Sequence, residues 1–275
     1  MGEPATSAGS APSEPPGDRR AWVEQIMGMP ISIHLRGAGL TGSQRPDGAP
    51  SSTIEGAVHA AFDALREVDA TFSTYRADSE ISRLARGELR LRDATAPVRE
   101  VARLCREARE ITQGWFDADR PDGAGGRTFD PTGLVKGWAV QRACTQLATG
   151  LPEHDVLVNA GGDIAVWCAR EDGEAWRLGI ENPLDRTALL ATLELRTGGL
   201  ATSGTAARGH HIYSPATGSA ATELASVSVI GPSLMWADVY ATAAFARGTG
   251  AVDWLRTLSD HTWLVVDCHG TVTTP

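Results

Sequence analysis

The sequence lacks the long apolar run, about 20 residues, that a membrane-crossing helix needs, so we expect no membrane insertion. Positive charge is also in short supply, because 25 basic residues stand against 34 acidic ones and the formal net charge is −9. A surface of that sign does not neutralise the phosphates of nucleic acid or adhere to anionic lipid. We therefore expect small molecules and other proteins as partners, and no nucleic acid.

Signatures of several common enzyme and metal-site classes are missing as well. The four cysteines stand far apart without a CxxC pair, which argues against a disulfide framework and a thiolate zinc site. The sequence has no HExxH motif, so a zinc hydrolase of that type is unsupported. In a Walker phosphate loop the lysine follows a glycine, whereas Lys136 precedes its glycine. Ser203 is not in the G-x-S-x-G setting of a serine hydrolase.

The N-terminal segment differs in composition from the rest of the chain. Residues 1–20 are rich in Pro, Ser, Gly and Ala and have no apolar stretch of the kind found in secretory signals. We expect residues 1–20 to form a disordered tail and residues 21–275 to form a single compact domain. A cytoplasmic location is the simplest prediction.

Apolar periodicity predicts helices first, then a block of strands, then a further helix and a last strand. That order favours a layered α+β domain over a repeated βαβ unit. One predicted helix begins near residue 52, and four others cover residues 78–87, 97–114, 133–150 and 233–248. The predicted strands cover 22–36, 155–159, 163–169, 176–180, 188–196, 225–231 and 262–267.

The clearest local signal for chemistry is the segment ADVYATAAF. Asp238 and Thr242 lie four residues apart in a predicted helix, so both side chains project from one face. A carboxylate and a hydroxyl suit Mg²⁺, which takes few protein oxygens and completes its shell with water and phosphate. Spacing alone favours a more ordinary arrangement, an exposed Asp and a Thr bonded to its own helix.

A second signal is FDPTGLVKGWAV, which joins Asp130, a turn reaching Gly133, and Lys136 in the first turn of a helix. Unpaired amides and a cation at a helix N-terminus suit phosphate, although a glycine turn followed by a solvated lysine is commoner than a site. Farther on, NAGGDI predicts a tight corner between two strands.

The polar stretch after residue 200 contains Ser203, Gly204 and His211. A histidine there is suited to binding phosphate or moving a proton, but adjacent loop histidines are usually only exposed. Earlier in the chain, Phe72 and Tyr75 fit a core position as well as they fit stacking on an aromatic ligand.

Taken in order, these segments resemble the ApbE family, the FAD:protein FMN transferases. The resemblance implies a T-fold-like arrangement of antiparallel sheets flanked by helices, in agreement with the α+β prediction. The matching segments run from about Met27 to Phe245 and are IMGMPISI, DATFSTYRADSEISRLA, TQGWFDA, FDPTGLVKGWAV, VLVNAGGDIAV, ATSG, HHIYSPATG, SVSVIG and ADVYATAAF.

The resemblance also assigns roles to particular residues. It implies Mg²⁺ bound by the side chains of Asp238 and Thr242 and the main chain of Gly133, with His211 and Asp238 as catalytic residues. The FAD-binding residues that it implies are Met27, Tyr75, Asp130, Gly133, Lys136, Ser203, Gly204 and His211. The chain departs from the family where Ser214 replaces a frequent acid and where residues 117–129 are shorter than usual.

The implied activity is the Mg²⁺-dependent transfer of FMN from FAD, as a substrate, to a Thr or Ser hydroxyl of an acceptor protein that carries a Ser/Thr flavinylation motif, with release of AMP. Two alternatives stay open: an FAD pyrophosphatase that gives FMN and AMP, and a non-catalytic flavin-binding or carrier protein. The sequence leaves the acceptor and the oligomeric state open.

Overall fold

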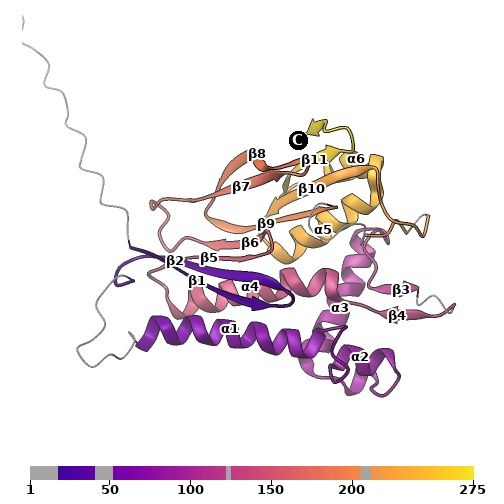
Figure 1. The fold of residues 1–275 in the computed structure, drawn as a ribbon, viewed down its shortest axis with the longest axis horizontal. Helices are drawn as coiled ribbons and strands as arrows, with labels where there is room; N and C mark the ends of the chain where they lie inside the picture. Colours follow the sequence, from indigo (N-terminus) through magenta and orange to yellow (C-terminus); the bar gives the residue numbers. More distant parts are fainter. Residues whose placement is uncertain (1–17, 41–51, 122–124, 206–211, 216) are drawn as a thin grey trace, which may run out of the picture.

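An eight-stranded antiparallel sheet forms the middle layer of the molecule (Figure 1). The computed structural model describes residues 18–40, 52–121, 125–205, 212–215 and 217–275. In sheet order the strands are β1 (Arg19–Ile26), β2 (Met29–Arg36), β5 (Asp155–Ala160), β6 (Asp163–Trp167), β9 (Thr197–Gly204), β10 (Leu224–Gly231), β11 (Thr262–Asp267) and β12 (Val272–Thr273).

Helices cover one face of this sheet, and a small two-stranded sheet lies on the other (Figure 1). Helices α4 (Thr132–Gly150) and α5 (Leu234–Arg247) contact each other and the sheet, and α1 (Ser52–Phe72) packs on α4. The remaining elements are α2 (Glu80–Ala85), η1 (Leu91–Asp93), α3 (Ala96–Ile111), β3 (Asp119–Pro121), β4 (Arg127–Phe129), β7 (Trp176–Asn182), β8 (Asp185–Leu195), η2 (Gly248–Gly250) and α6 (Ala251–Leu255).

Strand alternation divides the apolar core between the two faces of the main sheet. In β5, Val156 and Val158 belong to the large core beneath the helices, whereas Leu157 between them belongs to a smaller cluster under β7 and β8. Successive side chains of a strand point to opposite faces, so one central strand supplies both cores. The antiparallel α+β class predicted from the sequence is confirmed.

The segment 22–36, predicted as one strand, is instead a hairpin of β1 and β2. The turn is Met27–Gly28, and both residues have a positive φ, 55° and 72°. Two-residue hairpin turns with this backbone usually use Asn-Gly or Asp-Gly, so Met-Gly gave no turn signal. The strand β1 begins at Arg19, inside the segment 1–20 assigned to the tail, and residues 1–17 lie outside the described part.

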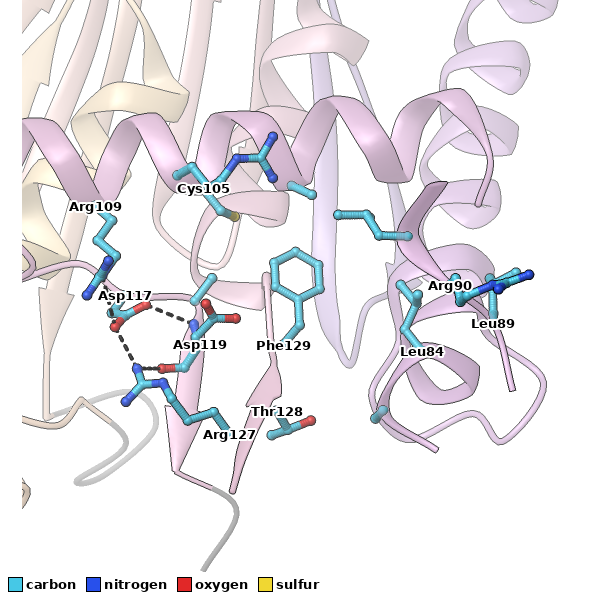
Figure 2. Close-up of a pocket in the computed structure, with 15 residues that line it drawn as sticks. Leu84, Leu89, Arg90, Cys105, Arg109, Asp117, Asp119, Arg127, Thr128 and Phe129 are labelled. Carbon is cyan, nitrogen blue, oxygen red and sulfur yellow. Dashed lines mark hydrogen bonds and ion pairs between the residues drawn. The ribbon is translucent and has the colours of Figure 1, made fainter. Parts of the chain in front are cut away.

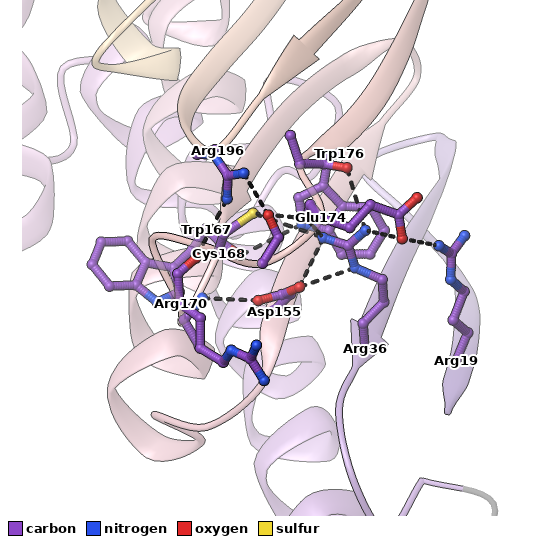
Figure 3. A network of polar contacts seen from close by, with 12 residues as sticks. Arg19, Arg36, Asp155, Trp167, Cys168, Arg170, Glu174, Trp176 and Arg196 are labelled. Atoms are coloured by element: carbon purple, nitrogen blue, oxygen red, sulfur yellow. Dashed lines mark hydrogen bonds and ion pairs between the residues drawn. The ribbon is translucent and has the colours of Figure 1, made fainter. Parts of the chain in front are cut away.

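A buried arginine connects the main sheet to the segment that leads into β7 (Figure 3). Arg36 on β2 is 6% exposed, and its guanidinium pairs with Asp155 at 2.7 Å and with Glu174 at 3.2 Å. The same group donates to the carbonyl of Ala175 at 3.3 Å and lies 4.1 Å from the centre of the Trp176 ring. Its donors and its face are thus engaged by β5 and by the 174–176 segment.

Membrane crossing finds no support in the described part of the chain. None of the helices there combines the length and apolar character that a bilayer span requires. This agrees with the absence of a long apolar run in the sequence.

Candidate active site

The site begins with an unusually close contact between α4 and α5. Gly137 on α4 faces α5, and a Cβ atom at that position would lie 3.0 Å from the Cα of Met235 and 3.1 Å from the Cβ of Asp238. Such distances are tighter than most contacts of a real Cβ atom. The missing side chain of Gly137 therefore brings the Asp238 carboxylate against the first turns of α4.

Three charged side chains meet at this contact. The Lys136 ammonium forms an ion pair with the carboxylate of Asp163, which begins β6, and lies 3.7 Å from Oδ2 of Asp238. Asp163 is 1% exposed and Asp238 3% exposed. Lys136 is the only lysine among the 25 basic residues of the chain. Since buried carboxylates are costly without a cation, this cluster is a built feature and not a solvated surface.

One hydroxyl group of β9 lies on the helix side of the sheet, as the charged cluster does. Ser203 Oγ and Thr242 Oγ1 are 3.2 Å apart, which links β9 to the helix that carries Asp238. The backbone N–H of Thr202 donates to Asp163 Oδ1 at 3.1 Å, whereas its hydroxyl is 2.8 Å from Ser228 Oγ on the opposite face of the sheet. Carboxylate and hydroxyl oxygens therefore come together from α5, β6 and β9.

These oxygen donors suit a hard cation such as Mg²⁺. Asp238 and Thr242 lie one helical turn apart on α5, as predicted, and the ordinary alternative of an exposed Asp238 is wrong. Within the described ranges no group of three or more His, Cys, Asp or Glu side chains could hold a metal ion. A cation here would complete its shell with hydroxyl, main-chain, water or phosphate oxygens.

The N-terminal turn of α4 lies beside this cluster. Asp130 Oδ1 accepts hydrogen bonds from the backbone N–H and the hydroxyl of Thr132, at 3.1 and 2.6 Å, and so fixes the start of the helix. Gly133 lies in the first turn, where a Cβ atom would be 3.2 Å from the Phe116 ring. Asp130 and Gly133 are thus structural parts of the turn that leads to Lys136.

The other residues to which the family resemblance gives a role have no direct contact with the charged cluster in the described structure. Met27 forms the β1–β2 turn and is partly buried, and Tyr75, between α1 and α2, is 98% exposed. Phe72 is a core residue that packs on Trp138, with ring centres 5.7 Å apart. Gly204 ends β9 opposite Ser226. His211 lies outside the described residues.

A cavity of about 510 Å³ lies between α2, α3 and the β3–β4 hairpin (Figure 2). Arg109 and Arg127 both pair with Asp117 at its edge, at 3.3 and 2.6 Å, and so connect α3 and β4 to the start of the 117–129 segment. Cys105 forms part of the wall, and burial raises the pKa of its thiol to about 12, so it stays a neutral wall residue at ordinary pH.

Two residues of the site were missed from the sequence, Asp163 and Gly137. Asp163 was noted only as part of a tight corner, and Gly137 only as a neighbour of Lys136. The fact that the chain has a single lysine, and that this lysine follows a glycine turn, was the available signal for a buried partner.

The model of the ApbE family matches residues 27–119 and 123–264. The chain belongs to the ApbE family. A curated relative, the FAD:protein FMN transferase of Vibrio cholerae serotype O1, is 31% identical over an alignment of 130 residues that covers 43% of this chain and 38% of that protein.

Solved structures of ApbE proteins share the fold over nearly the whole chain. The ApbE protein of Thermotoga maritima has a TM-score of 0.75 at 18% identity, covering 94% of this chain and 97% of that one. The flavin transferase ApbE of Vibrio cholerae has a TM-score of 0.72 at 22% identity, with the same coverage. The apo flavinyl transferase ApbE of Pseudomonas stutzeri has a TM-score of 0.72 at 22% identity, covering 95% and 96%.

Proposed function

We propose that this protein transfers FMN from FAD to a Thr or Ser hydroxyl of an acceptor protein and releases AMP, with Mg²⁺ as its cofactor. The reaction class is supported by the Vibrio cholerae relative, which is an FAD:protein FMN transferase. The observation that carries the proposal is the buried cluster of Lys136, Asp163 and Asp238, with hydroxyl groups beside it and the start of α4 next to it. Such a cluster suits a pyrophosphate and a divalent cation better than a neutral ligand.

In this proposal Asp238 and Thr242 hold Mg²⁺ together with the main chain of Gly133. The bound ion supplies positive charge that neutralises the pyrophosphate. Lys136 binds a phosphate oxygen from the α4 side, and the Ser203 and Gly204 end of β9 borders the reacting group. Asp130 holds the α4 turn in the geometry that phosphate binding needs. Met27 and Tyr75 border the flavin, where the exposed Tyr75 ring offers a face for stacking.

The chemical step forms one bond and breaks one. The acceptor hydroxyl oxygen attacks the FMN-side phosphorus, the bond from that phosphorus to the bridging oxygen breaks, and AMP departs. We assign to His211 the removal of the acceptor proton or the orientation of the phosphate, because an imidazole with an ordinary pKa of about 6.5 does both at neutral pH.

The direct test uses an acceptor protein that carries the Ser/Thr flavinylation motif. Incubation with FAD and Mg²⁺ is expected to add the mass of FMN to the acceptor, as read by mass spectrometry, and to release AMP in equal amount. The Asp238→Ala variant is expected to add none. If that variant labels the acceptor at the wild-type rate, the metal site is misassigned.

Omitting the acceptor separates the proposal from its alternatives. A transferase is expected to release AMP slowly under these conditions because it lacks its nucleophile. Rapid AMP release would identify a pyrophosphatase. Tight retention of FAD without AMP formation, whether the acceptor is present or absent, would identify a flavin carrier.

A further inference from the structure

Asp163 belongs to the charged cluster, but the proposed function assigns it no role in binding or catalysis. It follows the Gly161–Gly162 corner, in which both glycines have a positive φ, and its carboxylate is 1% exposed. Asn159 Oδ1 accepts a hydrogen bond from the backbone N–H of Gly162 at 2.9 Å and so fixes the corner. The corner therefore directs a carboxylate into the interior at a defined place.

Both oxygens of that carboxylate have partners on different elements. Oδ1 accepts from the backbone N–H of Thr202 on β9 at 3.1 Å, and Oδ2 pairs with the Lys136 ammonium on α4. The second buried carboxylate, that of Asp238, is farther from the ammonium, at 3.7 Å. Of the two acids that face Lys136, Asp163 makes the direct contact.

This difference matters because one cation faces two acids. A lysine ammonium is a compact charge on a flexible stem, so its position depends on the carboxylates around it. Without the charge of Asp163, the ammonium would pair directly with Asp238, which is the residue that the proposed function assigns to Mg²⁺. A monovalent side chain would then compete with the divalent ion for the same oxygens.

We propose that Asp163 is a positioning residue that holds Lys136 away from Asp238, so that Asp238 stays available to the divalent cation and Lys136 to a phosphate oxygen. The proposal rests on the proposed function for the identity of the metal site. It assigns to Asp163 no contact with metal or substrate, only the direction of the lysine.

A double-mutant cycle on cation binding tests this role without catalysis. Asp163→Asn removes the charge while an amide oxygen can still accept from Thr202 N–H, and Lys136→Met removes the competing ammonium. The dissociation constant of Mn²⁺, an oxygen-preferring stand-in for Mg²⁺, is measured without FAD from the electron paramagnetic resonance signal of the free ion. The four proteins are the wild type, both single variants and the double variant.

We expect Asp163→Asn to weaken Mn²⁺ binding about tenfold, and Lys136→Met to restore it in that background. The gain from Lys136→Met is expected to be about tenfold larger in the Asp163→Asn protein than in the wild type, which is a coupling typical of residues in contact. Equal gains in the two backgrounds would mean that the charges act independently, and this would overturn the proposal. Loss of Mn²⁺ binding in both proteins that carry Asp163→Asn, the single and the double variant, would make Asp163 a metal ligand. That result would also overturn the proposal.

Two further variants separate this inference from the proposed function and from general effects. Wild-type protein that binds no Mn²⁺, or Asp238→Asn protein that binds it as well as wild type, would remove the metal site and this inference with it. Asp155→Asn removes a carboxylate that pairs with Arg36, outside the site, and is expected to leave Mn²⁺ binding unchanged. Should Asp163→Asn fail to fold by circular dichroism, Asp163→Ser replaces it in the cycle.

Discussion

Two cations, the buried Arg36 and the partly buried Lys136, each face two acids in this molecule, yet they are held in different ways. Arg36 pairs with Asp155 and Glu174, donates to main-chain carbonyls and lies on the Trp176 ring (Figure 3). Lys136 has the carboxylates of Asp163 and Asp238 on its ammonium. The planar guanidinium is fixed in direction by its partners, whereas an ammonium is a point charge with rotatable donors.

The two cations also differ in the groups that surround them. Arg36 is enclosed by an indole ring and carbonyl groups, which leave no place for a ligand. Lys136 stands next to Gly137 and near the hydroxyl pair of Ser203 and Thr242, where small and polar groups allow a phosphate to approach. We infer that the first cluster stabilises the fold and that the second is kept for binding and chemistry.

The largest expected effect is on activity and comes from changing Asp238, one of the two acids near Lys136. Asp238→Asn keeps the shape of the side chain but removes the charge assigned to Mg²⁺, so FMN transfer should fall by about 10³-fold. The melting temperature should change little, because one of the two acids near Lys136 remains. Rates of acceptor labelling at saturating FAD, together with thermal melts, measure both quantities. A rate within a few-fold of wild type would contradict the inference that the Lys136 cluster serves chemistry while the Arg36 cluster serves stability.

The converse change, Arg36→Met, should reduce stability and spare activity. Removing one partner of a buried ion pair costs about 3–5 kcal/mol, and the lower end applies here because Glu174 is largely exposed. Urea unfolding gives the free energy, and labelling of the acceptor at a temperature where the variant is folded gives the activity. Arg36→Lys should recover only part of the stability, because a lysine cannot contact Asp155, Glu174 and the Trp176 ring at once as the planar guanidinium does.

An added methyl group at Gly137 tests whether the close approach of α4 and α5 sets the geometry at Lys136. In Gly137→Ala the new Cβ would lie 3.0 Å from the Cα of Met235, so α5 has to shift by a few tenths of an ångström, at a cost of about 1–3 kcal/mol. We expect weaker Mn²⁺ binding as well, since Asp238 moves with α5.

The matched control for this change is Gly56→Ala on α1, where a Cβ atom would meet nothing within 4 Å. That substitution should stabilise the helix by about 0.5–1 kcal/mol and leave cation binding unchanged. If both variants behave alike, the effect at Gly137 is one of helix propensity and not of contact.

The sequence predicted the local parts of the site better than their assembly. The spacing of Asp238 and Thr242 predicted one helical face, and α5 contains both residues one turn apart. The pairing of Lys136 with Asp163 could not be predicted in this way. It depends on how the β5–β6 corner packs against α4, and no spacing along the chain indicates that contact. The Met27–Gly28 turn was missed for a related reason, since its backbone is imposed by the pairing of β1 with β2.

The smallest expected effect concerns acid, which should act on both regions through histidines near them. His34 lies two residues before Arg36, and the His261 ring lies 5.0 Å from that of Tyr240 on α5. Burial lowers the pKa of both imidazoles.

An unfolded histidine takes up a proton near its ordinary pKa of about 6.5, before the folded one does, so protonation favours unfolding. The stability due to the neutral rings is therefore complete above about pH 6.5 and declines as the pH falls below it. Replacing His261 with Phe should reduce the loss of melting temperature between pH 7.5 and pH 5.5 by roughly one to two degrees. His59→Phe, at an exposed position of α1, is the control for the loss of a histidine. A drop as steep in His261→Phe as in the wild type would assign the acid sensitivity of the α5 region to groups other than His261.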